Sequence, residues 1–217
     1  MRTIEEFREL MIAVLHESLH RPAFYCCVGR TADSFYSQII SQLCWIDERE
    51  AEFRHLTVHD GMLGGPMGVY GQFFDQHLSI PDRFSNEIAS TYAQAAYRLG
   101  YFSPERVLAE KEFDKLKLAL GRNFMKIDHV MSEIVLQFGK PSLDVLGGQT
   151  TVHCYGSCDR NASWIYFDYS RCFPPIDSRT FDWFDEPKLR DIRKMNNKMK
   201  LLPFGAWCRD RTCSSGG

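Results

Sequence analysis

The only recognised catalytic pattern in the sequence lies close to its start. The segment His16–His20 fits the pattern H-E-x-x-H. Residues four apart share one face of a helix, so its two imidazoles could bind one Zn²⁺ while Glu17 activates the bound water. The extended motif H-E-x-x-H-x-x-G-x-x-H is not fulfilled, because Ala23 stands at its glycine position and Cys26 at its third histidine position. The pattern therefore offers zinc-dependent hydrolysis as an alternative function, without selecting a third ligand.

A second group of potential zinc ligands surrounds a predicted hairpin further along the chain. His153 and Cys154 are adjacent, Cys158 follows them, and Cys172 lies beyond the second strand. Structural zinc sites usually carry paired C-x₂₋₄-C elements, and only one clear pair is present here. Successive residues of a strand also point to opposite faces of a sheet, which separates His153 from Cys154. We therefore expect no zinc site at the hairpin.

A glycine-rich stretch from Asp60 to Gly71 interrupts the helical pattern. It holds five glycines and one proline: Gly61, Gly64, Gly65, Gly68, Gly71 and Pro66. This composition opposes both a regular helix and a well-packed strand. Glycine-rich loops can cradle phosphates, but neither G-x-x-x-x-G-K-[ST] nor G-x-G-x-x-G occurs, and no lysine lies nearby. We expect a connecting loop, with a binding or gating role as the alternative.

Local start and stop signals predict four helices in the first 121 residues. Thr3 and Glu6 form a capping box, and the first helix ends at His20 because Pro22 follows shortly. Residues 23–28 then form a short apolar run that is typical of a strand. The other predicted helices begin at Asp33 as N-cap, near Asp82, and at Ser103 as N-cap with Pro104 at N1, and the last two end at Gly100 and Gly121.

A change of period in the second half of the chain defines the predicted fold class. Apolar residues at spacings of three and four predict a helix over Phe124–Phe138, which Gly139 ends. β-Branched and aromatic residues over 151–155 and 164–167 then predict a β-hairpin, whose apolar face needs cover from helices. We therefore expect one α+β domain over residues 1–217, predominantly helical, with five or six helices and a small antiparallel sheet built on this hairpin.

Two neighbouring segments of opposite charge follow the hairpin. Aromatic and acidic side chains crowd residues 173–185, and a last helix is predicted over 188–200, where six Lys and Arg residues accompany a single Asp. Interfaces draw most of their binding energy from a few aromatics and arginines. The predicted partner-binding residues are Phe181, Trp183, Phe184, Arg190 and Arg193. The basic charge suggests an acidic partner, and packing of Trp183 against the core is the alternative.

Composition, apolar runs and charge indicate the cellular compartment of the protein. The chain has 217 residues, an apolar share of 44% and a formal net charge of −2, which is ordinary for a globular protein. The apolar run Leu10–Leu15 is far short of the roughly 20 residues that a transmembrane helix requires. Glu5 and Glu6 precede it, where a signal peptide carries positive charge. We expect a cytoplasmic protein without a membrane segment, and therefore eight reduced cysteines.

The sequence contains no nucleophile–base motif, cofactor fingerprint or convincing metal set. We therefore expect a non-enzymatic protein-binding module without a cofactor. Such a module is most simply an inhibitor or immunity-type protein, a bacterial-type accessory protein that occludes a partner such as an enzyme. The alternative is a zinc hydrolase with His16 and His20 as ligands and Glu17 as base. Nucleic-acid binding through helix 188–200 comes third, because the rest of the chain carries −7 and opposes phosphate binding.

Overall fold

A computed structural model describes residues 3–26, 29–71, 84–120, 124, 129–147, 150–173 and 182–194. Within these residues, six α-helices and one four-stranded antiparallel sheet confirm the predicted α+β class. The helices are α1 (Ile4–His20), α2 (Gly29–Ile46), α3 (Glu50–Arg54), α4 (Ser85–Leu99), α5 (Glu110–Ala119) and α6 (Met131–Phe138), with short 3₁₀ turns η1 (Pro22–Phe24) and η3 (Gly65–Met67) and the π-helical turn η2 (His55–His59). The strands are β1 (Leu143–Leu146), β2 (Thr150–Tyr155), β3 (Ile165–Phe173) and β4 (Asp182–Lys194).

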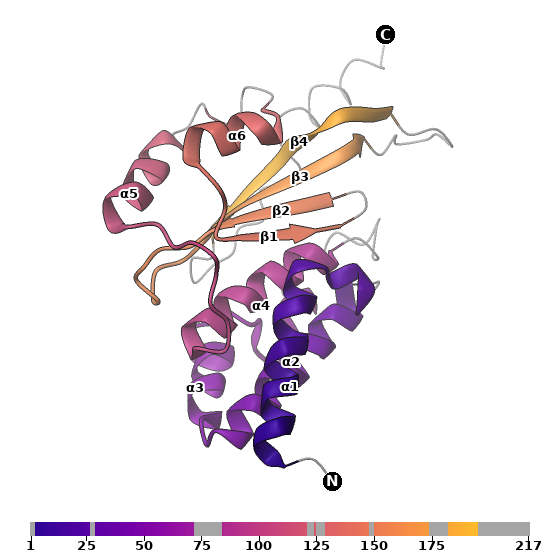
Figure 1. The fold of residues 1–217 in the computed structure, drawn as a ribbon, viewed down its shortest axis with the longest axis vertical. Coiled ribbons are helices and arrows are strands. Elements are labelled where there is room, and N and C mark those ends of the chain that lie inside the picture. The colour runs from indigo at the N-terminus through magenta and orange to yellow at the C-terminus, as the bar shows by residue number, and fades with distance from the viewer. Residues whose placement is uncertain are drawn as a thin grey trace.

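The sheet has the strand order β1-β2-β3-β4, and every neighbouring pair is antiparallel. The predicted hairpin is confirmed as β2 and β3, with His153 opposite Phe167. Helices cover both faces of the sheet (Figure 1). One face packs against α1 and α4 through residues such as Val152 and Tyr166, and α2 packs on these two helices; we name this cluster the helical core. The other face packs against α5 and α6 through residues such as Tyr155, and we name this the outer core.

Helix α4 lies between the other N-terminal helices and the sheet (Figure 1). Every residue of α4 except Arg98 is buried, although its sequence contains several polar side chains. A helix buried on all sides is normally apolar throughout, so these polar groups require partners inside the protein.

Two predicted helix ends are confirmed. Gly100 ends α4 with a left-handed φ of 78°, and Gly139 ends α6 with a φ of 79°.

Helix α1 follows its local sequence signals. The Thr3 hydroxyl accepts the Glu6 N–H at 3.2 Å, and the Glu6 carboxylate accepts the Thr3 N–H at 2.9 Å, which confirms the capping box. The predicted end at His20 is also correct. The strand predicted over 23–28 is wrong for its described part, residues 23–26, where the chain forms the 3₁₀ turn η1 with Pro22 at its first position; residues 27 and 28 lie outside the described chain.

Tertiary contacts overrule two other predicted helix starts. Helix α2 begins at Gly29, so Asp33 lies inside it rather than capping it. Helix α5 begins at Glu110, not after Ser103. The intervening chain pairs with the segment after β2: the Leu108 N–H donates to the Gly156 carbonyl at 2.8 Å. These backbone bonds replace the intrahelical bonds that a helix from Ser103 would have made.

The basic helix predicted over 188–200 is wrong for its described part. Residues up to Lys194 belong to β4, which pairs with β3, and residues 195–200 lie outside the described chain. Leu189 enters the outer core, whereas Arg190 and Arg193 contact α4. Helix α6 begins at Met131, seven residues after the predicted start at Phe124.

Among the described residues, no helix combines the length and apolarity needed to cross a bilayer.

The four described cysteine side chains are free thiols, and they differ sharply in access. Cys158 is exposed, while Cys26, Cys44 and Cys154 are buried. Burial raises the pKa of the Cys44 and Cys154 thiols, which lowers their thiolate fraction at neutral pH.

We therefore expect iodoacetamide to alkylate Cys158 at least about tenfold faster than the three buried cysteines in the native protein. Peptide mass spectrometry after timed labelling measures the rates, and labelling in denaturant provides the reference. Labelling of Cys154 at the rate of Cys158 would contradict the packing of β2 against α4.

Candidate functional site

The predicted partner-binding residues divide into an outer and an inner set. Trp183 is 60% exposed near the start of β4. Phe184 is partly exposed, and the Lys188 ammonium lies 4.7 Å from the centre of its ring. Phe181 lies outside the described residues. The two arginines of the predicted set do not belong to this surface, because both guanidinium groups turn toward α4.

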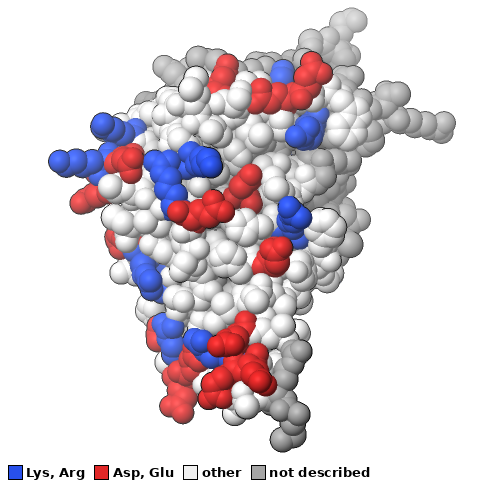
Figure 2. Space-filling model, viewed as in Figure 1, with Lys and Arg blue, Asp and Glu red and all other residues white. Residues whose placement is uncertain are grey.

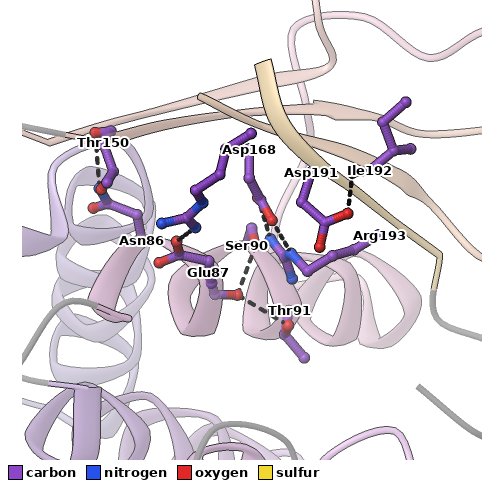
Figure 3. A network of polar contacts seen from close by, with 10 residues as sticks. Asn86, Glu87, Ser90, Thr91, Thr150, Asp168, Asp191, Ile192 and Arg193 are labelled. Carbon is purple, nitrogen blue, oxygen red and sulfur yellow. Dashed lines mark hydrogen bonds and ion pairs between the residues drawn. The ribbon is translucent and has the colours of Figure 1, made fainter. Parts of the chain in front are cut away.

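Arg193 forms a bidentate ion pair in the interior (Figure 3). Its Nε lies 2.5 Å from Asp168 Oδ2 and its Nη2 lies 2.8 Å from Asp168 Oδ1. Nη2 also donates to the Ser90 hydroxyl of α4 at 3.0 Å. Both charged side chains are only 2% exposed. Parallel N–H···O bonds of this kind fix geometry as well as energy, so the pair joins β4, β3 and α4 in one arrangement.

Arg190 makes the second ion pair between β4 and α4, with the carboxylate of Glu87. Glu87 is 1% exposed, and burial raises its pKa while the charge of Arg190 opposes that rise. Asp191 lies beside these pairs, and burial together with the charge of Asp168 raises its pKa to about 6. On the same face of α4, the Asn86 amide donates to the Thr150 hydroxyl at 2.7 Å (Figure 3).

This network takes two arginines out of the predicted basic surface. Arg190 and Arg193 were the arginines of the proposed basic surface, and both are neutralised inside the protein. On the face seen in Figure 2, basic and acidic side chains are interspersed, and acidic ones crowd the lower end near the start of α1. The nucleic-acid alternative and the acidic partner stay predictions, because residues 195–200 of the basic segment lie outside the described chain. Trp183 and Phe184 are what the described chain retains of the predicted partner surface.

Strand β4 is an edge strand of the sheet. In the described chain its outer edge is paired near Lys188, which bridges to Val130, and at Leu189, whose N–H donates to the His129 carbonyl at 2.8 Å. Glu186 also accepts the Ser132 N–H at 2.6 Å. These contacts fix the middle of β4 against the segment that leads into α6.

The two histidines of the H-E-x-x-H segment pack against an aromatic ring rather than around an ion site. The ring centres of His16 and His20 are 5.5 Å apart, and that of Phe102 lies 4.9 Å from His16. Burial, followed by the charge of His16, lowers the pKa of His20. Glu17 is exposed. Within the described residues, no group of three or more His, Cys, Asp or Glu is placed to hold a metal ion.

His153 and Cys154 lie on opposite faces of β2, as the alternation predicted. Cys154 belongs to the helical core. His153 lies on the other face, where the centre of its ring is 4.8 Å from the centre of the Tyr169 ring. His153 is 3% exposed, and burial lowers its pKa to about 4. The nearest carboxylate oxygen, Oδ1 of Asp144, lies 3.5 Å from its Nε2.

A cavity of about 450 Å³ lies beneath the glycine-rich segment, and we name it the glycine pocket. Its lining residues come from α2, from the end of α3 and η2, from residues 63–71 and from α4: Arg30, Asp33, Ser34, Ser37, Phe53, Thr57, Leu63, Gly65, Met67, Gly68, Tyr70, Gly71 and Tyr92. The run of glycines was the only sequence signal for it. The lining residues of α2 carried no signal, because Asp33 was interpreted as a helix cap.

Asp33 holds the roof of the glycine pocket in place. Its carboxylate accepts the N–H groups of Val69 at 3.1 Å and Tyr70 at 3.2 Å, and the Tyr92 hydroxyl of α4 at 2.7 Å. Gly68 has a φ of 68°, and a Cβ there would lie 2.1 Å from Asp33 Oδ2. The close approach therefore requires glycine at this position.

Comparisons of the sequence and the structure with protein families, with curated proteins and with solved structures give no match. Function must therefore be inferred from the geometry alone.

We expect Asp168→Asn to lower the free energy of unfolding by about 3–5 kcal/mol, because it leaves the Arg193 charge buried without its counter-ion. Urea titration measures the loss, and the double variant Asp168→Asn, Arg193→Met should recover part of it. Asp47→Asn is the matched control, since its pair with Arg8 is partly exposed and should contribute at most about 1 kcal/mol. Equal losses in the two single variants would show that the interior pair does not anchor β4.

His153 gives the protein a specific pH dependence. Its pKa is about 4 in the folded protein and about 6.5 in the unfolded chain, so the unfolded chain binds the proton first as the pH falls. Stability from this residue is present above pH 6.5 and is lost toward pH 4. Between pH 7 and pH 5 the expected loss is about 2 kcal/mol. Urea titrations of the wild type and of His153→Gln at both pH values isolate the contribution; the same loss in both proteins would contradict the burial of a neutral imidazole.

Proposed function

We propose that this protein is a non-enzymatic binding protein that recognises another protein through the first part of β4. The observation that carries the proposal is the 60% exposure of Trp183 on a strand whose other end is fixed by buried ion pairs. Tryptophan is strongly enriched among the residues that dominate interface energetics. A large aromatic on a rigid edge strand can meet a partner with little loss of conformational entropy.

The neighbourhood of Trp183 in the sequence also suits an interface. Phe184, the next residue of β4, is partly exposed, and the Lys188 ammonium lies 4.7 Å from the centre of its ring, so the same strand carries a second aromatic and a charge. Together with the exposed Trp183, these side chains support binding of another protein.

The finer proposal is that the partner is an enzyme and that binding inhibits it. Inhibitory binding needs surface complementarity rather than catalytic groups, which fits a chain whose sequence holds no convincing catalytic set. No feature of the described residues favours one enzyme class. Once a captured partner is identified, its activity in the presence of the protein tests inhibition separately from binding.

We expect Trp183→Ser to leave the melting temperature within about 2 °C of the wild type and to abolish capture of a specific partner from a lysate of the source cells. Trp45→Ser is the matched control, because Trp45 is 70% exposed on α2 and is not part of the proposed surface. Affinity capture with quantitative mass spectrometry compares the three proteins.

Two outcomes would contradict the proposal. Loss of the same proteins in both serine variants would indicate non-specific adhesion to exposed tryptophan. Unfolding of Trp183→Ser would mean that Trp183 supports the core instead, since a buried tryptophan such as Trp164 contributes about 3–5 kcal/mol.

A further inference from the structure

Helix α1 leaves part of its apolar surface exposed. Ile4, Phe7 and Leu10 follow one another at spacings of three and are 68%, 46% and 41% exposed, and we name these three residues the α1 stripe. Residues three apart are neighbours on a helix surface. Met11 and Leu15, on the adjoining side of the helix, are buried in the helical core. The apolar surface of α1 is therefore wider than the surface that the protein itself covers.

Helix α2 lies antiparallel beside α1, and its surface there is uncharged. Arg8 pairs with Asp47, just after the end of α2, at 2.7 Å, and the Tyr36 hydroxyl of α2 donates to the Ser18 carbonyl of α1 at 2.7 Å. From residue 34 to residue 46, α2 contains no charged side chain. Figure 1 shows α1 running along the outside of the helical layer, with its start at the end of the molecule farthest from the sheet.

The charge that accompanies the α1 stripe is negative. Helix α1 has four glutamates and one arginine, and that arginine, Arg8, is already paired with Asp47. Glu9 is next to Leu10 in the sequence, and Glu17 lies two turns further along on the same side of the helix as Leu10. Both glutamates are exposed, and within the described chain neither carboxylate makes a hydrogen bond or an ion pair. The stripe is thus an exposed apolar surface with uncompensated carboxylates at its rim (Figure 2).

This combination selects among the surfaces that could cover the stripe. A second copy of the chain would bring the same carboxylates together, and an anionic lipid surface would repel them. A neutral apolar segment would cover the stripe but leave the carboxylates without counter-charges. The stripe extends about 9 Å along α1, close to the distance of about 10 Å between anchors seven residues apart on a bound helix. A helix with cations beside its apolar side matches both the length and the charge.

We propose that the α1 stripe binds a cationic amphipathic helix of another protein. The apolar side of that helix packs on Phe7 and Leu10, and its Lys or Arg side chains pair with Glu9 and Glu17. The stripe lies on α1 and the surface around Trp183 lies on β4, so this site does not depend on the function proposed for β4.

Three synthetic peptides of about 18 residues, long enough to form a helix, test the class of partner. The first has leucines at helical spacing and lysines elsewhere, the second has glutamate in place of every lysine, and the third has the residues of the first in an order that gathers no apolar side. Fluorescence anisotropy with the full chain measures their affinities. We expect the first peptide to bind at least about tenfold more tightly than either of the others.

Each failure of this order has its own meaning. Equal or tighter binding of the glutamate peptide would overturn the cationic partner. Equal binding of the reordered peptide would show that charge alone attracts the probe, which would overturn the amphipathic helix. No binding of any peptide up to about 1 mM would overturn the site.

Two variants locate the binding. Phe7→Gln with Leu10→Gln should weaken binding of the first peptide at least about tenfold and leave the melting temperature within about 2 °C. The matched control is Leu118→Gln with Leu136→Gln, at exposed positions of α5 and α6, which should not change the affinity. Glu17→Lys tests the same surface without altering an apolar residue: it should weaken the first peptide and strengthen the glutamate peptide, each at least about threefold. Unchanged affinities in either α1 variant would show that the peptide binds elsewhere.

Two further measurements test the other occupants. Sedimentation equilibrium of the chain alone would assign the stripe to a second copy if it detected a dimer that Phe7→Gln with Leu10→Gln dissociates. Flotation with vesicles of phosphatidylcholine and phosphatidylglycerol would assign it to a lipid surface if the same variant lost binding. We expect neither result, and either one would overturn the proposal.

Discussion

The ion pair between Arg193 of β4 and Asp168 of β3, completed by Ser90 of α4, is the contact on which the rest of the structure depends. Every residue of helix α4 except Arg98 is buried, so nearly all of its polar groups are shielded from water. A buried polar group without a partner costs about 1–3 kcal/mol, and a buried unpaired charge costs more. Side chains that β2 and β4 direct at α4 supply partners for Asn86, Glu87 and Ser90, so the sheet supports the burial of the helix and the helix that of the charged strand residues.

The same contact selects one arrangement of β4. The pairing of β3 with β4 shifts register between Asp168 and Tyr169, and this irregularity brings both Arg190 and Arg193 to α4 while Leu189 enters the outer core. A slip of one residue would place a cation in the outer core and an apolar side chain against the carboxylates. An apolar strand would tolerate such a slip more readily. We infer that the buried charges contribute specificity of register more than net stability.

How well the sequence predicted each element depends on how far apart in the chain the residues that determine it lie. The capping box of α1, the end of α4 at Gly100 and the β2–β3 hairpin depend on residues a few positions apart, and all were predicted. Asp33 and Arg193 were misinterpreted, because their partners lie 36 and 25 residues away and no local window contains them. Local sequence signals indicated a helix cap at Asp33 and a basic helix over 188–200, whereas tertiary pairing determines the role of Asp33 and the strand that holds Arg193. The only sequence signal for the glycine pocket was the run of glycines in the segment that forms its roof.

The separation of Glu87 and Arg190 by 103 residues has a consequence for how the chain is made. At about 5–20 residues per second, the ribosome adds Arg190 roughly 5–20 s after Glu87. Throughout that interval the nascent helix α4 has a carboxylate and hydroxyls on the side that the sheet will later cover. Water can satisfy these groups, whereas an apolar helix surface exposed for as long would invite aggregation. The polar composition of this buried helix therefore also protects the chain during its synthesis.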